Sequence, residues 1–325
     1  MSDPVGFGVI GANSFVANAA VLPAIDAAPN ARLVATASRS SAVPERWSDT
    51  DVDTYDAVLA HPEVEAVYLP LPNGLHEAWT RRCAAAGKHV LCEKPLAWDA
   101  ATARSMATAC NDAGVLLAEA WMTPFHARYR EVLDRARAGD IGDIVSIDGS
   151  FRFTIGPEAA DNYRWDRNQG GGALLDVGIY CLGAIVELFD AHPTNVVAHQ
   201  QLRGGVDAET SAVLDWSGRR LGSISCSFVG DESQELSIAG TLGRLVIPTE
   251  AFTGGVNDSG YVQVTPAFDG TAADVVVHDG ANDSYQSMVE AFATAVRGET
   301  EWPRPVERSI EMLNLIERIK ESAVD

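Results

Sequence analysis

The chain has 325 residues, of which 45 are acidic and 24 are basic, so its formal net charge at pH 7 is −21. Hydrophobic residues make up 46% of the chain, which is typical of a folded globular protein and excludes a disordered or collagen-like one. The acidic excess argues against binding to nucleic acid, which requires a basic stripe, and against binding to an anionic membrane surface. At roughly 150 residues per domain, this length predicts two domains.

Lysine is rare in this chain, because only Lys88, Lys94 and Lys320 are present and every other basic residue is arginine. This acidic, lysine-poor composition fits either a salt-adapted, halophilic cytosol or a GC-rich genome, and both interpretations remain open. We expect a cytoplasmic protein, because the sequence shows no signal-peptide pattern and no run of 18 or more apolar residues. The five cysteines include no CxxC pair and are interpreted as reduced core thiols.

The first third of the chain alternates between strand and helix patterns. Short apolar runs predict strands at 7–10, 32–37, 66–69, 89–92 and 115–118. Helices are expected between them at 14–27, at 75–86 and from Asp99, a plausible N-cap, to about residue 113. Buried strands separated by helices predict a Rossmann-type α/β domain with a parallel sheet, which we place at residues 1–121.

After residue 121 the pattern changes, and residues 122–325 are expected to form an α+β substrate-binding and oligomerisation domain. A helix is predicted at 124–138, and alternating apolar and polar residues predict a half-buried strand at 145–155. Further strands are expected to build an open, mostly antiparallel sheet, at 208–216, 221–229, 235–239, 245–247, 261–265 and 275–278. Helices at 172–189, 285–297 and 306–322 are candidates to cover one of its faces.

The turn after the first strand resembles a dinucleotide-binding fingerprint. Gly11 permits a tight turn, and the helix that follows would offer free N–H groups to a pyrophosphate. The match is imperfect, because Asn13 replaces the second glycine and the small residue Ala17 falls one position late. Asparagine tolerates a positive φ, so the turn can still form. The candidate cofactor-binding residues here are Gly11, Asn13, Ser14, Phe15 and Val16.

The end of the second predicted strand indicates which nicotinamide cofactor is preferred. NAD sites usually place an acid at this point to hold the ribose 2′-hydroxyl, whereas this chain has Ser38 and Arg39. A guanidinium can pair with a 2′-phosphate and stack on adenine. These two residues therefore predict NADP in preference to NAD, with an ordinary surface arginine as the alternative.

Two further strand ends are predicted to line the cofactor. The predicted strand at 66–69 is followed by Leu71, Asn73 and His76. The predicted strand at 89–92 is followed by Glu93 and Lys94, which belong to an EKP tripeptide. Ligands of parallel sheets bind outside the carboxyl ends of the strands, so Lys94 is expected to point at the nicotinamide region. Glu93 would restrain its neighbours.

These segments identify a family resemblance that covers essentially the whole chain. The sequence resembles the Gfo/Idh/MocA oxidoreductases in the segments GVIGANSFVA, YLPLPNGLHEAW, GKHVLCEKPLA, EAWMTPFHARY, NYRWDRNQGGGALLDVGIYCLG and SIAGTLGRLVIP. It is most similar to the branch that holds NADP-dependent D-xylose and D-glucose dehydrogenases, dihydrodiol dehydrogenases and glucose–fructose oxidoreductase. The resemblance implies that Lys94 and Tyr180 flank the reacting carbon and that Asp176 is a third catalytic residue. Inositol-type members usually have histidine in place of Tyr180.

The local pattern supports these assignments. Asp176 and Tyr180 are four residues apart, so on a helix they share one side. The glycines at 170–172 would let the chain approach a cofactor closely. Arg164 and Trp165 are expected to meet the nicotinamide or the substrate, with packing at a sheet edge as the alternative. Candidates for the wall of a sugar pocket, with ordinary packing as the alternative, are Phe153, Trp121 and His126.

The expected chemistry is removal of a hydroxyl proton while a hydride leaves the same carbon. Tyr180 is our preferred acid/base, because a nearby Lys94 ammonium would favour the tyrosinate form. Lys94 would bind the reacting oxygen and Asp176 would orient the substrate. The opposite assignment, a neutral Lys94 as base, remains open.

The function expected from the sequence is an NADP-dependent dehydrogenase that oxidises an aldopyranose of the D-xylose or D-glucose type at C1. The alternatives are an NADPH-dependent keto-sugar reductase, a dihydrodiol dehydrogenase and, from a different class, an inactive nucleotide-binding regulator. The expected ligand besides the cofactor is a sugar or polyol. We expect no metal site, and a homodimer or homotetramer formed through the open sheet of the second domain.

Overall fold

The computed structural model describes residues 3–39, 44–52, 54–159, 161–189, 192–253, 259–266, 274–279 and 283–324. The chain forms two compact units, one of Met1–Met122 with Tyr285–Ile310 and one of Thr123–Ser284 with Glu311–Asp325. The expected second domain, 122–325, therefore lacks 285–310, which returns to the first unit. This segment packs on the first unit because the ring of Phe292 lies 5.9 Å from that of Phe7. A hydrogen bond also holds it, since Asn30 Nδ2 donates to the carbonyl of Glu290 over 2.9 Å.

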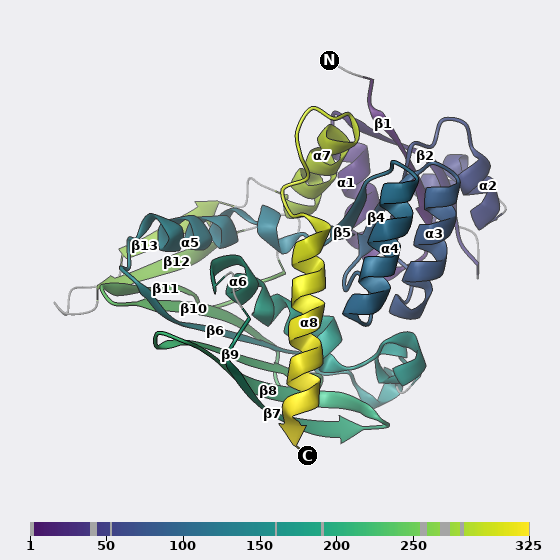
Figure 1. Cartoon of the computed structure of the whole chain (residues 1–325). Helices are drawn as coiled ribbons and strands as arrows, with labels where there is room; N and C mark the ends of the chain where they lie inside the picture. The colour runs from purple at the N-terminus through teal and green to yellow at the C-terminus, as the bar shows by residue number, and fades with distance from the viewer. Residues whose placement is uncertain are drawn as a thin grey trace. The chain divides into compact units, whose positions relative to one another are not determined.

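The first unit is built on a parallel five-stranded sheet in the order β2-β1-β3-β4-β5 (Figure 1). The expected Rossmann-type sheet is confirmed. The strands, in chain order, are β1 (Val5–Ile10), β2 (Ala31–Ala37), β3 (Ala66–Leu69), β4 (His89–Glu93) and β5 (Leu117–Ala120). The last strand begins two residues later than expected. All residues of β1, β3 and β5 are buried, as the strands of a sheet covered on both faces must be.

Helices cover both faces of this sheet. Gly8 faces Val58 of α2, whereas Phe7, on the opposite face, meets Phe292 of α7. Asp99 is confirmed as an N-cap, because its carboxylate accepts the N–H of Thr102 over 2.6 Å. The α-helices of this unit are α1 (Leu22–Ala27), α2 (Tyr55–Ala60), α3 (His76–Ala85), α4 (Ala100–Asp112) and most of α7 (Ser284–Val296). A π-helical turn, Ala17–Val21, runs directly into α1.

The second unit contains a nine-stranded sheet in the order β13-β12-β11-β10-β6-β9-β8-β7-β14. Its strands are antiparallel except for the pairs β6–β9 and β7–β14, so the expected mostly antiparallel sheet is confirmed. The strands are β6 (Ile144–Arg152), β7 (Asn195–Arg203), β8 (Val206–Trp216), β9 (Arg220–Ser227), β10 (Ser233–Gly240), β11 (Gly243–Ile247), β12 (Ser259–Pro266), β13 (Asp274–Asp279) and β14 (Ala323–Val324).

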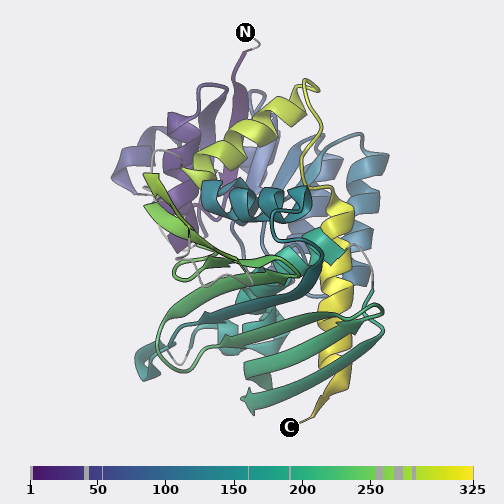
Figure 2. The ribbon, with the colours of Figure 1, turned by 90° about the vertical axis from the view of Figure 1, so that its left-hand side faces the viewer.

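One face of this sheet is packed against the buried helix α6 (Ile179–Phe189), and Figure 2 looks onto the opposite face. Gly149 of β6 allows the close approach, since a Cβ there would lie 2.9 Å from Cα of Cys181. The segment Arg167–Phe189 is long enough to span a membrane, and an 18-residue window within it has a mean hydropathy of 1.8. However, 89% of that window is buried inside the protein. We therefore assign it as a core helix. The other α-helices that contribute to this unit are α5 (Ala127–Ala138) and α8 (Val306–Ser322), which begins in the first unit.

Candidate functional site

The candidate site residues fall into two groups, one in each unit, and each group is described separately. In the first unit they lie at the carboxyl edge of the parallel sheet, where β1 to β4 end. Gly11 follows β1 with φ +100°, a conformation that favours glycine, and its N–H donates to the carbonyl of Ala37 at the end of β2. A Cβ at Gly11 would lie 2.8 Å from Leu71 Cδ2, so the turns after β1 and β3 touch only because this residue is glycine.

The residues after Gly11 form a helix start that is held by side chains. Ser14 Oγ accepts the N–H of Ala17 over 3.1 Å, as an N-cap does. Asn18 Nδ2 donates to the carbonyls of Ala12, over 2.7 Å, and of Ser14, over 3.1 Å. The sequence prediction missed Asn18, because the Gly-rich fingerprint contains no position for it. Asn13 and Val16 are partly buried in this turn, and the Phe15 side chain is 88% exposed.

The second strand ends as the sequence predicts. Ser38 is partly buried and Arg39 is exposed, directly after the last residue of β2. An exposed guanidinium at this strand end is free of any ion pair given for the described residues. It can therefore meet an anionic group of a ligand.

His76 connects the turn after β3 with the turn after β4. Its Nε2 lies 2.8 Å from the carbonyl oxygen of Leu71, and its Nδ1 lies 3.1 and 3.2 Å from those of Pro95 and Leu96. Burial lowers the pKa of His76, against the raising effect of these carbonyls, and the ring lies between the two turns. Asn73, in the same turn, is buried.

Lys94 directly follows β4 and is half-buried, next to a buried carboxyl group. Glu93 Oε1 accepts the hydroxyl of Tyr68 over 2.6 Å, and Glu93 Oε2 accepts the backbone N–H of Lys94 over 3.2 Å. Burial raises the pKa of Glu93 to about 7, although the Tyr68 hydrogen bond and the Lys94 charge act in the opposite direction. Glu93 thus restrains its neighbours, as expected.

In the second unit, Tyr180 and Asp176 belong to one helical segment and both are buried. Arg164 Nε donates to Asp176 Oδ2 over 2.5 Å, and the Arg164 charge also interacts with Tyr180. Burial, the largest single effect, acts against the charged guanidinium, but Asp176, Tyr163 and Tyr180 together outweigh it and raise the pKa of Arg164. Arg164 is therefore a permanent cation beside the acid and the phenol.

The segment that carries Asp176 is a π-helical turn, Leu174–Gly178, and not the regular α-helix that the sequence suggests. Such turns are frequent at functional sites. Asp207, at the start of β8, holds this turn, because its Oδ2 accepts the N–H of Leu174 over 2.6 Å and the hydroxyl of Thr210 over 3.0 Å. Asp207 is a further functional candidate, and no local pattern in the sequence marks it.

The glycines at 170–172 allow close approaches within the second unit. A Cβ at Gly171 would lie 2.4 Å from the carbonyl oxygen of Arg164, and one at Gly172 would lie 2.2 Å from Asp207 Oδ1. Their close approach is therefore to this unit's own groups, and it allows Arg164 and Asp207 to reach the turn that carries Asp176.

An aromatic cluster lies beside Tyr180. The Tyr180 ring is 5.4 Å from Phe151, and Phe153 and Trp165 pack against Phe228 at 5.3 and 5.4 Å. Arg164 lies 5.9 Å from the ring centre of Phe153. Phe153 and Trp165 are partly exposed, whereas Trp121 and His126 are buried and are better explained by packing.

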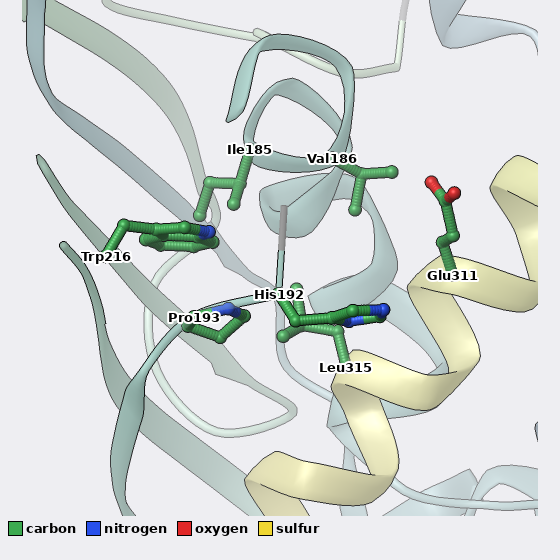
Figure 3. Close-up of a pocket in the computed structure, with 7 residues that line it drawn as sticks. All are labelled: Ile185, Val186, His192, Pro193, Trp216, Glu311 and Leu315. Atoms are coloured by element: carbon green, nitrogen blue, oxygen red, sulfur yellow. The ribbon is translucent and has the colours of Figure 1, made fainter. Parts of the chain in front are cut away.

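A separate hollow lies between α6, β8 and α8 in the second unit (Figure 3). Its lining is mostly apolar and includes none of the candidate site residues: Ile185, Val186, His192, Pro193, Trp216, Glu311 and Leu315. Among the residues that the structure describes, no group of three or more His, Cys, Asp or Glu side chains could hold a metal ion.

Two family profiles match this chain over most of its length. Residues 5–120 match "Oxidoreductase family, NAD-binding Rossmann fold", and residues 129–246 match "GFO/IDH/MocA C-terminal domain".

Individual proteins extend the match. A D-xylose 1-dehydrogenase (NADP(+)) from Haloferax volcanii is 36% identical over 98% of this chain and 97% of its own length. A trans-1,2-dihydrobenzene-1,2-diol dehydrogenase from Xenopus laevis is 30% identical over 74% of this chain and 73% of its own length. The crystal structure of a 3-ketoreductase from Actinomadura kijaniata, in complex with NADP and TDP-benzene, superposes with a TM-score of 0.88 at 30% identity, and the match covers 99% of each chain.

Proposed function

The chain belongs to the Gfo/Idh/MocA family of oxidoreductases, and we propose that it is an NADP-dependent sugar dehydrogenase that oxidises an aldopyranose at C1. The observation that carries the proposal is the cluster on the second unit, where Arg164 fixes the Asp176 carboxylate beside Tyr180. Such a cluster offers an acceptor for a sugar hydroxyl and a phenol for proton transfer. The similarity to the D-xylose 1-dehydrogenase supports oxidation at C1 over the other reactions.

The residues at the carboxyl edge of the first sheet fit a dinucleotide. The Gly11 turn carries no Cβ, the helix after it begins at the edge, and Phe15 projects into solvent there. Gly11, Asn13, Ser14, Phe15 and Val16 would hold the pyrophosphate, and further positions would line the rest of the cofactor: Ser38, Arg39, Leu71, Asn73, His76, Glu93, Lys94, Arg164 and Trp165. The bound cofactor supplies a hydride acceptor for the oxidation.

Preference for NADP over NAD rests on Arg39. An exposed guanidinium two residues after β2 suits a 2′-phosphate, and the residues that directly follow this strand in the sequence, Ser38 and Arg39, include no acid to hold a ribose hydroxyl. We expect Arg39→Ala to lower kcat/KM with NADP by about tenfold or more, the loss of one charge-assisted contact, and to leave that with NAD unchanged. An equal loss with both cofactors would contradict this role.

In the proposed reaction, Tyr180 takes the proton of the sugar hydroxyl. The Arg164 charge interacts with Tyr180, and Lys94 would stabilise the charge that develops on the reacting oxygen. Asp176, held by Arg164, would accept a hydrogen bond from a neighbouring sugar hydroxyl. The opposite assignment has Lys94 as base and Tyr180 as donor.

The test is a panel of sugars and diols scored by NADPH formation, with single-turnover kinetics of the variants. We expect oxidation of D-xylose or D-glucose, and at least 100-fold slower hydride transfer in Tyr180→Phe, as for loss of a general base. A Tyr180→Phe variant with the wild-type rate would overturn the assignment of Tyr180. Intact NADP binding with no turnover on any substrate would favour the regulator.

Similar proteins also support two other reactions, the reduction of a keto sugar and the oxidation of a dihydrodiol. The ketoreductase from Actinomadura kijaniata and the dihydrodiol dehydrogenase from Xenopus laevis match this chain over most of its length. Faster reduction of a keto sugar, or oxidation of a dihydrodiol, in the same panel would replace the proposed C1 oxidation.

We also propose a cytoplasmic homodimer or homotetramer that associates through the face of the nine-stranded sheet shown in Figure 2. Val197 and Val213 pair across β7 and β8 and are 61% and 50% exposed, and Leu221 is 45% exposed. Such apolar exposure on a sheet face is typical of an interface. Sedimentation of Val213→Lys should show a monomer, whereas an unchanged mass would exclude this face. Activity that rises with KCl concentration would indicate salt adaptation.

A further inference from the structure

A buried ion pair in the first unit lies beside the loop of Lys94. Glu119 stands in β5, and its Oε2 accepts Arg304 Nη1 and the hydroxyl of Ser309, each over 2.7 Å. The Arg304 Nη1 also donates to Ser309 Oγ over 2.7 Å, so the three side chains form a closed triangle. The side chains of Arg304 and Glu119 are only 5% and 2% exposed.

This pair reaches the Lys94 loop through the other carboxylate oxygen. Glu119 Oε1 accepts the backbone N–H of Leu96 over 2.8 Å, two residues after Lys94. Arg304 and Ser309 belong to the segment that runs from α7 into α8, which passes β5 in Figure 1. A segment about two hundred residues downstream in the sequence thus bonds to the carboxylate that holds this loop.

The register of β4 and β5 shows that the loop is held from both faces of the sheet. Cys92 pairs with Glu119, and Glu93 pairs with Ala120. Because side chains alternate along a strand, Glu93 and Glu119 leave the sheet on opposite faces. Glu93 holds the N–H of Lys94 from one face, and Glu119 holds the N–H of Leu96 from the other.

Stability alone explains this arrangement poorly. Replacing a buried ion pair with apolar residues of similar volume is often neutral or stabilising, because taking two charges out of water is costly. We propose that Glu119, held by Arg304 and Ser309, is a positioning residue that fixes the loop of Lys94. The catalytic consequence rests on the proposed function, in which Lys94 binds the reacting oxygen.

The same unit provides a control pair of the same composition, whose side chains are more exposed, at 38% for Glu65 and 24% for Arg297. Glu65 accepts the N–H of Gly6 over 3.2 Å and pairs with Arg297 of the same returning segment, whose Nη2 lies 2.9 Å from Glu65 Oε1. Glu65 precedes β3, so it lies at the amino edge of the sheet, whereas Lys94 follows β4 at the carboxyl edge. Glu65→Gln and Glu119→Gln therefore break the same kind of contact at opposite edges.

The experiment compares these two variants in the full chain by amide hydrogen exchange and by steady-state kinetics. In Glu119→Gln we expect exchange of the Leu96 amide to rise about tenfold and kcat to fall by about tenfold, as for a displaced reacting group, with KM changed less than twofold. Glu65→Gln should change neither the Leu96 exchange nor kcat. Unchanged Leu96 exchange in Glu119→Gln would overturn the proposal, and so would faster exchange with an unchanged kcat.

A milder variant covers the case in which Glu119→Gln does not fold. Ser309→Ala removes one donor to Glu119 Oε2, and we expect both effects at about threefold. Wild-type Leu96 exchange and kcat in Ser309→Ala would then overturn the proposal. If the wild-type protein oxidises no sugar at all, the exchange measurement still decides the positioning role, while the proposed function fails separately.

Discussion

Asp207 accepts a hydrogen bond from the backbone N–H of Leu174, two residues before Asp176. Burial raises the pKa of Asp207, although the Leu174 and Thr210 hydrogen bonds lower it. Asp207→Ala removes the single oxygen, Oδ2, that accepts both hydrogen bonds, so we expect it to lower the free energy of unfolding by about 1–3 kcal/mol and to slow turnover. Asp207→Asn keeps one acceptor oxygen, so we expect smaller losses of unfolding free energy and of turnover.

Denaturant unfolding and kcat check this prediction. Asp215, exposed on the same strand, is the control, and Asp215→Ala should leave both quantities unchanged. Equal unfolding midpoints for Asp207→Ala and the wild type would contradict the role of Asp207.

The pair of Arg164 and Asp176 predicts a separation of stability from activity. Arg164→Met leaves a buried carboxylate without its cation, so we expect a loss of about 1.5–3 kcal/mol of stability. Adding Asp176→Asn removes the stranded charge and should restore part of that stability while turnover stays low. A double variant that regains wild-type kcat would show that neither side chain takes part in the reaction.

The buried carboxyl of Glu93 predicts a pH dependence of stability. Its pKa is about 7 in the folded chain against an ordinary value of 4.5, because burial disfavours the charged form. Between these values the folded state binds more protons, so stability falls as pH rises from 4.5 to about 7, by on the order of 3 kcal/mol at most.

Unfolding of wild type and Glu93→Gln at several pH values measures this contribution. The advantage of the wild type over Glu93→Gln should shrink as pH rises through this window. Parallel stability curves for the two proteins would show that Glu93 titrates normally.

The cysteines are predicted to be unreactive in the native protein. All five are buried, and burial raises the pKa of Cys83 to about 12 and that of Cys110 to about 11. Because the thiolate is the reactive form, a thiol reagent at pH 8 should label fewer than one cysteine per native chain and all five after unfolding. Fast labelling of the native chain would place at least one thiol at the surface.

Local signals predicted much of the fold. The alternation over 145–155 predicted β6, Asp99 predicted the start of α4, and the helix predicted at 124–138 ends before Gly139, which has φ +84°. These features depend on neighbours in the sequence. By contrast, α2 has only six residues, too few for a clear apolar period, and it was missed.

The candidate site divides in the same way. Gly11, Glu93 and Lys94 could be placed because strand ends of a parallel sheet share one edge. Asp207 and Glu119 could not, since each acts on a backbone N–H that is 33 or 23 residues away. The return of 285–310 to the first unit was missed because a helix pattern does not state which sheet its apolar face will meet.

The π-helical turn at Leu174–Gly178 makes the length of this segment part of the site. Each residue of an α-helix adds about 100° of rotation, and a π-turn accommodates one more residue than an α-turn. Deleting a single residue there would let an α-turn close, and it would rotate the side chains that precede the deletion about the helix axis relative to those that follow it. Substitutions in this segment change one side chain, whereas a one-residue deletion would reorient several side chains without altering any of them.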